Sequence, residues 1–239
     1  MPFTFAHPAI VLPLARASSR YFSLTALVIG SIIPDFEYFL RAEIYSAYSH
    51  TVTGLLYFDA PVGLIVYLAF VYIVRMPLLI HLPEYFRERF NSSFYQMRWR
   101  VVVGSILIGA ASHLIWDSFT HRTGYIAQLM TFLQKSVIIG DYPVPIFKVM
   151  QHGSTLMGLL VIIVVIGQLP RHAGNPGNHI AYYWLIAFAA FSICLGIRYF
   201  NGDFTTIGDY VVASIAGALL GVFMASVYYR IRFLYGRII

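Results

Sequence analysis

Five long apolar segments dominate this sequence, and each is long enough to cross the hydrocarbon core of a membrane. A transmembrane helix needs about 20 mostly apolar residues, because each residue adds about 1.5 Å along an axis that crosses about 30 Å of lipid. Of the 239 residues, 59% are hydrophobic and only 11% are charged, whereas soluble domains usually carry about 25% charged residues. The sequence therefore predicts an all-α, polytopic membrane helical bundle, as a single domain over residues 1–239. The five predicted transmembrane helices cover residues 52–74, 101–119, 155–169 (with a start near 152), 180–198 and 208–229.

Two shorter apolar segments, 8–17 and 21–33, precede these spans. In one arrangement the second segment is a lone span and His7 lies in the cytoplasm. In the other, the two segments form a helical hairpin whose arginine-bearing tip reaches the cytoplasmic side, so that His7 and Asp35 lie together at the outer end. Asp35 and His113 then lie at a similar depth, each about 20 Å from the basic end of its own helix. We favour the hairpin.

Basic residues set the orientation of the spans. The loop at 75–100, the loop at 170–179 and the C-terminal tail fall on one side when the five spans are threaded, and together they carry most of the arginines. Because positively charged segments stay in the cytoplasm, we expect this side to be cytoplasmic. The net charge of +6 is then membrane-flanking charge. Since no basic stripe marks a soluble face, nucleic-acid binding is excluded.

Histidine and aspartate side chains interrupt the apolar pattern. His113, Asp117 and His121 are spaced four residues apart, so a helix through them carries imidazole, carboxylate and imidazole on one face. Ionisable groups inside a membrane span are costly and mark functional sites. The same threading brings further histidines and an aspartate to the outer side at a similar depth, although they come from distant parts of the chain. The candidate metal ligands are His7, Asp35, His50, His113, Asp117, His121 and His152.

These residue types favour a divalent metal ion, most readily Zn²⁺, which takes imidazole nitrogen and carboxylate oxygen as ligands. The set suffices for one to three ions, with Asp117 or Asp35 as a bridge between two. Other interpretations stay open. The triplet on residues 113–121 is also typical of an ion pair or a proton relay, Asp35 of a helix cap, and His50 and His152 of residues at the membrane interface.

Several motifs resemble those of a family of uncharacterised bacterial membrane proteins, which implies a bacterial cytoplasmic membrane. The resemblance covers roughly residues 1–165, whereas residues 166–239 add two helices without such a motif. The motifs are Met-Pro-Phe-Thr-Phe-Ala-His7-Pro, Gly30-Ser-Ile-Ile-Pro-Asp35-Phe-Glu-Tyr-Phe39, Ser49-His50-Thr51, Gly109-Ala-Ala-Ser-His113-Leu-Ile-Trp-Asp117-Ser-Phe-Thr-His121 and Gln151-His152-Gly-Ser154.

More distantly, the order of these residues is similar to that of membrane-bound metal-dependent hydrolases and of the all-helical, zinc-dependent phospholipase C fold. The resemblance supports the hairpin, because it makes His7 part of the site. The chain departs from the secreted phospholipases in lacking an N-terminal Trp ligand and in being embedded in the membrane, which leaves the metal count and the substrate open. The ligands that this resemblance implies are His7, Asp35, His50, His113 and Asp117, with His121 and His152 as further candidates.

We expect a membrane-embedded, metal-dependent hydrolase that acts on a lipid-linked phosphoester with metal-activated water, on the outer side of the membrane. Asp117 or Asp35 would orient the water, and a membrane lipid or lipid-like molecule would be the substrate. Two other functions stay open. A transporter or channel predicts polar residues that continue to the cytoplasmic side, and a structural subunit held by a metal predicts closed, four-ligand coordination. The oligomeric state is not indicated.

Overall fold

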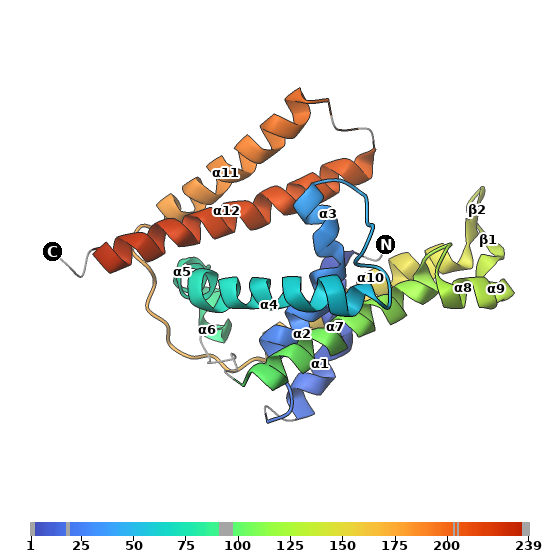
Figure 1. Ribbon diagram of the computed structural model, residues 1–239, viewed down its shortest axis with the longest axis horizontal. Coiled ribbons are helices and arrows are strands. Elements are labelled where there is room, and N and C mark those ends of the chain that lie inside the picture. Colours follow the sequence, from blue (N-terminus) through green and yellow to red (C-terminus); the bar gives the residue numbers. More distant parts are fainter. Residues whose placement is uncertain (1–2, 18–19, 91–97, 203, 205, 236–239) are drawn as a thin grey trace. The chain divides into compact units, whose positions relative to one another are not determined.

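The chain folds into helices that form two compact units (Figure 1). The structure, a computed structural model, describes residues 3–17, 20–90, 98–202, 204 and 206–235. The first unit comprises residues 1–35, 48–64 and 94–168, and the second comprises residues 36–47, 65–93 and 169–239. The division of one membrane domain into residues 1–165 and 166–239 stays a prediction.

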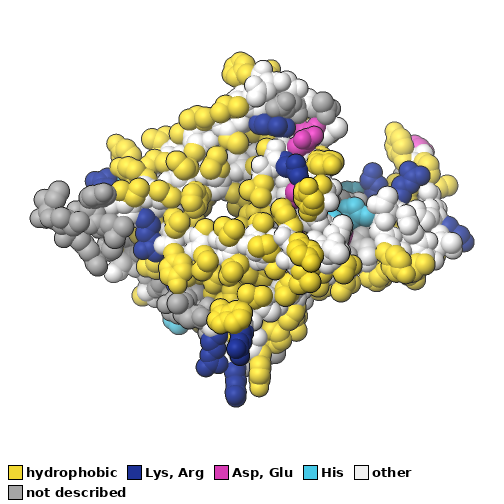
Figure 2. All heavy atoms as spheres, in the orientation of Figure 1, with side chains coloured by type: hydrophobic (Ala, Val, Ile, Leu, Met, Phe, Trp, Pro, Cys, Tyr) yellow, Lys and Arg dark blue, Asp and Glu magenta, His cyan; other side chains and the backbone are white. Residues whose placement is uncertain are grey.

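Five helical stretches within the described residues are long and apolar enough to cross a membrane, which confirms the predicted all-α, polytopic class. Large apolar side chains lie exposed along them, and Figure 2 shows these side chains in yellow over much of the visible face. Such exposure is typical of a surface that contacts lipid. The five stretches are Leu55–His81, Trp99–Leu129, Ile146–Gln168, Ile180–Phe200 and Ile207–Arg232.

The N-terminal segments form the predicted hairpin, because α1 (Pro8–Ala17) packs against α2 (Leu24–Ile32). Pro8 opens α1, a position where its missing N–H costs nothing. Pro34 converts the end of α2 into the 3₁₀ turn η2 (Ile33–Asp35), since proline cannot continue the α-helical hydrogen bonds. The other elements of the first unit are η1 (Thr4–Ala6), the π-helical turn η3 (Leu55–Asp59), the first half of α4 (Ala60–Ala69), α7 (Trp99–Thr120), α8 (Tyr125–Leu129), α9 (Thr131–Gln134), β1 (Ser136–Ile139), β2 (Tyr142–Pro145) and α10 (Ile146–Gln168).

Close packing of α2 against α7 forms the centre of the first unit. A Cβ atom added at Gly109 would lie 2.5 Å from the Leu27 carbonyl oxygen and 2.6 Å from the Ser31 nitrogen. Small residues allow such backbone approach in membrane proteins, where packing rather than the hydrophobic effect holds helices together. At the start of α2, the Ser23 amide donates to Ser105 Oγ over 3.0 Å. The two helices therefore run side by side in the same direction, and the C-terminal end of α2 lies beside the polar stretch of α7.

Residues 120–151, which lie between two of the predicted spans, contain regular structure. α10 begins at Ile146 rather than near 152, directly after the β2 residue Pro145. Before it, β1 and β2 pair as an antiparallel hairpin, in which Ile139 lies opposite Tyr142. The two-residue turn contains Gly140 with a φ of 61°, a conformation that glycine adopts at little cost. The first turns of α10 contain polar residues, so the hydropathy pattern placed the start of the helix too late.

The second unit also corrects one boundary. We expected a loop at 75–100, but the helix of residues 55–81 continues through α5 (Arg75–His81), and α6 (Glu84–Phe90) follows. Leu82 is extended because it precedes Pro83, which disfavours the helical region for its neighbour. Residues 91–97 of this segment lie outside the described residues. The other elements of this unit are α3 (Phe36–Arg41), the rest of α4, the π-helical turn η4 (Phe70–Val74), α11 (Ile180–Phe200) and α12 (Ile207–Tyr235).

The last two helices pack along each other, as the orange and red ribbons of Figure 1 show. Tyr183, Ala187 and Ala225 form their buried core. Gly221 lies against the backbone carbonyl of Ala187, so the two helices approach closely. This pair carries none of the candidate metal ligands.

Candidate metal centre

The local fold of three segments delivers the ligand side chains to one place in the first unit. His7 is the C-cap of η1 and directly precedes the Pro8 that starts α1. Asp35 ends the 3₁₀ turn that Pro34 imposes after α2. His113 and Asp117 lie one turn apart on α7, so their side chains leave the same face of that helix. Three of these four residues are fully buried, and Asp117 is 8% exposed.

His50 completes the cluster from the turn that precedes η3. Its Nε2 lies 3.4 Å from Asp35 Oδ1 and 3.9 Å from Asp117 Oδ2. Its Nδ1 lies 3.0 Å from Ser49 Oγ. The His50 side chain is 22% exposed, so it marks the open side of the cluster.

Backbone contacts orient the His113 ring. Its Nδ1 lies 2.8 Å from the Ser31 carbonyl oxygen, which can only accept a hydrogen bond. Nδ1 therefore carries the proton, and Nε2 presents its lone pair to the cluster. A histidine that ligates a metal commonly donates its other N–H in this way. The His7 ring stacks on His113 with centroids 3.8 Å apart and an interplanar angle of 15°.

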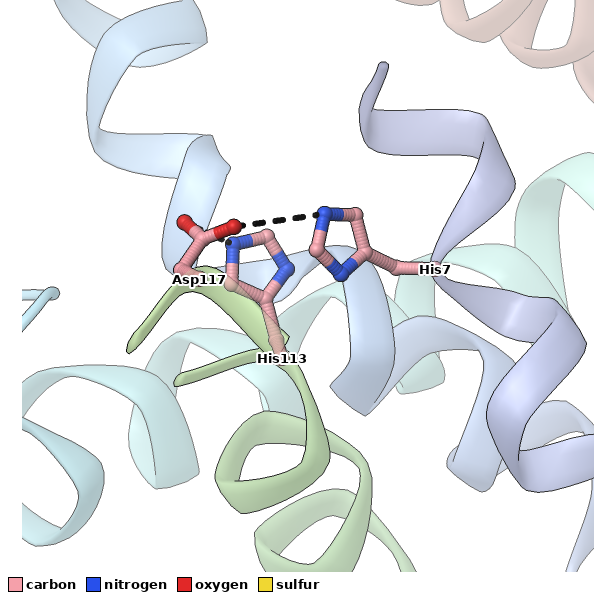
Figure 3. A group of neighbouring side chains, drawn as sticks. All are labelled: His7, His113 and Asp117. Atoms are coloured by element: carbon pink, nitrogen blue, oxygen red, sulfur yellow. Dashed lines mark ion pairs between the residues drawn. The ribbon is translucent and has the colours of Figure 1, made fainter. Parts of the chain in front are cut away.

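The donor atoms are spaced as ligands of a shared ion would be. His113 Nε2 lies 3.6 Å from Asp35 Oδ1 and 3.4 Å from Asp117 Oδ2, and His7 Nε2 lies 3.7 Å from Asp117 Oδ1. Figure 3 shows His7, His113 and Asp117 converging, with dashed lines for the ion pairs. Two ligands about 2.1 Å from one zinc ion lie about 3.4–3.6 Å apart at tetrahedral to trigonal angles. The two His113 separations fall within this range, and the His7–Asp117 separation of 3.7 Å lies just above it.

Unsatisfied polar atoms also fit a cation. Asp35 Oδ1, His113 Nε2, both Asp117 carboxylate oxygens and both His7 ring nitrogens are buried and make no hydrogen bond. Two buried carboxylates without enough donors are costly in an apolar surrounding. A divalent ion coordinated by these atoms would remove that cost. The residues therefore fit a metal, and two overlapping triplets of potential ligands, His7–His113–Asp117 and Asp35–His50–His113, each have their donor atoms within 4.8 Å of one another.

His121 and His152 stand apart from these triplets. His121 caps the C-terminal end of α7 with an extended backbone, so it does not continue the helical face as we expected. Its Nδ1 lies 3.0 Å from the Asp117 backbone oxygen and 3.6 Å from Asp117 Oδ1. His152 is exposed on α10, where it lines a cavity with the β1–β2 hairpin. The structure thus brings five of the seven predicted residues together, with His121 at their edge.

Three further residues support the site, although no role for any of them was predicted from the sequence. Thr4 donates its hydroxyl to Asp35 Oδ2 over 2.5 Å, and the Trp116 ring lies 5.1 Å from the His7 ring. The Trp116 indole donates to Ser154 Oγ over 3.0 Å, which ties α7 to α10. Thr4 and Trp116 each lie within three residues of a candidate ligand and inside the quoted motifs, and these two facts were the available signal.

Fold and site together define a polytopic helical membrane protein with a buried cluster of histidines and aspartates. Residues 1–227 match the family described as "Domain of unknown function (DUF4184)", and the chain belongs to this family. No curated protein and no solved structure matches the chain.

Proposed function

We propose that the chain is a metal-dependent hydrolase of a lipid-linked phosphoester. The observation that carries the proposal is the convergence of three imidazoles and two carboxylates at metal-ligand spacing. When bound, a divalent ion such as Zn²⁺ activates a water molecule and polarises a phosphoryl oxygen. The ligands would be His7, Asp35, His50, His113 and Asp117.

The two aspartates take different roles in this proposal. Asp35 is fully buried, and Thr4 occupies its second oxygen, so it serves as a fixed ligand. Asp117 lies at the open side, beside the partly exposed His50 and His121. Asp117 is therefore the carboxylate that orients the attacking water and accepts its proton.

One ion fits the cluster better than several. The two triplets share His113, whose Nδ1 is already engaged by the Ser31 carbonyl. Its single remaining nitrogen cannot serve two ions at once. A single ion is therefore proposed, from the range of one to three ions that the sequence allowed.

The proposal places the site toward the outer side of the membrane. Basic residues at the opposite end of α7, Arg98 and Arg100, support this orientation. The inner part of the α2–α7 contact holds buried Leu27, Val102 and Ile106. The buried polar side chains there, Ser23 and Ser105, carry no charge, so the buried side chains of this contact do not continue the ionisable groups inward as an ion or proton pathway would need. Lipid molecules reach a site at this depth laterally from the leaflet.

Hydrolysis in nanodiscs tests the proposal. Purified protein is supplied with lipid phosphoesters, and the released phosphate or headgroup is measured with added Zn²⁺ and with chelator. We expect metal-dependent release that Asp117→Asn reduces by about 100-fold or more, whereas His172→Ala, in the second unit, leaves it unchanged. A metal-loaded protein that releases nothing from any phospholipid class would point to a structural metal instead.

A further inference from the structure

Two hollows follow one another along helix α10 in the first unit. The outer hollow, of about 510 Å³, lies between the β1–β2 hairpin and the first turns of α10, where Val149 and Gly153 line it. The inner hollow, of about 300 Å³, is a groove between α1, α7 and α10, where Met157 and Val161 line it. These four α10 residues are spaced by four, so they share one face of the helix over about 18 Å. One elongated molecule can therefore contact both hollows.

The two hollows differ in chemistry. Lys148 and His152 line the outer hollow and lie one turn apart on α10. Figure 2 shows dark-blue cationic side chains near the hairpin that Figure 1 labels β1 and β2. The inner groove is lined almost wholly by apolar side chains, among them Ile10 and Met157. The two hollows together, called the α10 track below, therefore suit an amphiphile with a negatively charged end and an apolar chain.

The candidate metal centre lies beside the middle of the α10 track, where the two hollows meet. Trp116 lines the inner groove and is also 5.1 Å from the His7 ring, centroid to centroid. Its hydrogen bond to Ser154 holds the indole at the junction of the two hollows. In a phospholipid, the phosphodiester lies between the acyl-bearing part and the headgroup. That arrangement matches the order of groove, metal centre and cationic hollow.

The surrounding membrane is the available source of such an amphiphile. Within the most apolar 18-residue stretch of α10, only 6% is buried inside the protein, so this helix faces lipid. The hairpin connects two candidate spans, which keeps Lys148 close to the headgroup layer. Each cation at that level favours anionic over neutral lipids by about fivefold.

We propose that this face of α10 binds the substrate of the metal centre, and that the substrate is an anionic phospholipid of the surrounding leaflet. One acyl chain lies in the groove beside Met157 and Val161, and the headgroup lies between Lys148 and His152. The inference rests on the proposed function, but the binding it describes is measurable without turnover. It gives His152 a place in substrate binding rather than in metal ligation.

Photo-crosslinking of full-length protein in nanodiscs tests the inference. The probes are phosphatidylglycerol and phosphatidylcholine with a diazirine on one acyl chain, used with chelator present, and mass spectrometry locates the label. We expect phosphatidylglycerol to label Met157 and Val161 more than Leu156 and Leu160, which are exposed on the same helix. Met157→Trp fills the groove and lowers the label at Val161 to about a fifth, whereas the matched Leu156→Trp leaves it unchanged.

Charge substitutions test the headgroup position. Lys148→Gln lowers the preference for phosphatidylglycerol over phosphatidylcholine by about fivefold, and the control Lys135→Gln leaves it intact. Equal labelling of Leu156 and Met157, or no preference for the anionic probe, overturns the inference even if the protein hydrolyses another phosphoester. Groove labelling in a protein that binds no metal supports the lipid site and contradicts the proposed hydrolase.

Discussion

At the residue scale, Thr4 is the side chain whose role is most specific. Its hydroxyl donates to Asp35 Oδ2 and so holds the carboxylate with Oδ1 toward His50 and His113. Outer hydrogen bonds of this kind change metal affinity by about 10–100-fold. We expect Thr4→Val to weaken Zn²⁺ binding by this factor in a competition titration, while Thr123→Val, at an exposed position, has no effect. Equal affinity of both variants would show that Asp35 is held by other contacts.

His121 offers a second test at the residue scale. Its Nδ1 faces the Asp117 backbone oxygen, and neither triplet of potential ligands includes it. We therefore expect His121→Ala to retain stoichiometric metal, measured by elemental analysis of the purified protein. Loss of metal in this variant would show that His121 is a metal ligand, as the sequence suggested.

The five residues of the cluster could be predicted from residue types and threading, because histidine and aspartate stand out in an apolar chain. Thr4 and the Ser31 carbonyl could not, since a hydroxyl or a backbone oxygen has no signature outside its tertiary contact. His152 was included because it has the same residue type at the same expected depth. Its actual place follows from the start of α10, which hydropathy located six residues too late.

At the element scale, the α2–α7 contact positions His113. Gly109→Ala would place a methyl group against the Leu27 carbonyl and the Ser31 amide, the residue whose carbonyl orients the His113 ring. We expect a loss of about 1–3 kcal/mol of stability and weaker metal binding. Gly104→Ala is the matched control on the same helix, because an added Cβ there meets nothing within 4 Å. Thermal unfolding in detergent measures both, and an equal response of the two variants would contradict the close contact.

Helix existence was easier to predict than helix ends. Long apolar runs identified the five spans because membrane thickness fixes a minimum length. The helix of residues 55–81 passes through Arg75, and a charged residue at a span end gave no sign that the helix continues. The β1–β2 hairpin was not predicted, because strands of four residues are too short to give a clear hydropathy pattern.

At the scale of the whole molecule, the proposed orientation makes a prediction of its own. The chain has a single cysteine, Cys194, so Cys194→Ser provides a background for new labels. We expect Asp141→Cys, in the turn of the β1–β2 hairpin, to react with an impermeant maleimide on intact cells. Glu84→Cys should react only after lysis. The reverse pattern would place the metal centre on the cytoplasmic side.

The proposed function of this protein depends on a metal ion bound by the histidine–aspartate cluster. Elemental analysis of purified wild-type protein beside His113→Ala, Asp117→Asn and His152→Ala tests it most directly, with monodispersity and helicity measured in parallel. We expect about one Zn²⁺ per chain in the wild type and in His152→Ala, and little in folded His113→Ala or Asp117→Asn. A wild-type protein that is metal-free after expression in zinc-supplied cells, or equal zinc in all four proteins, would contradict it.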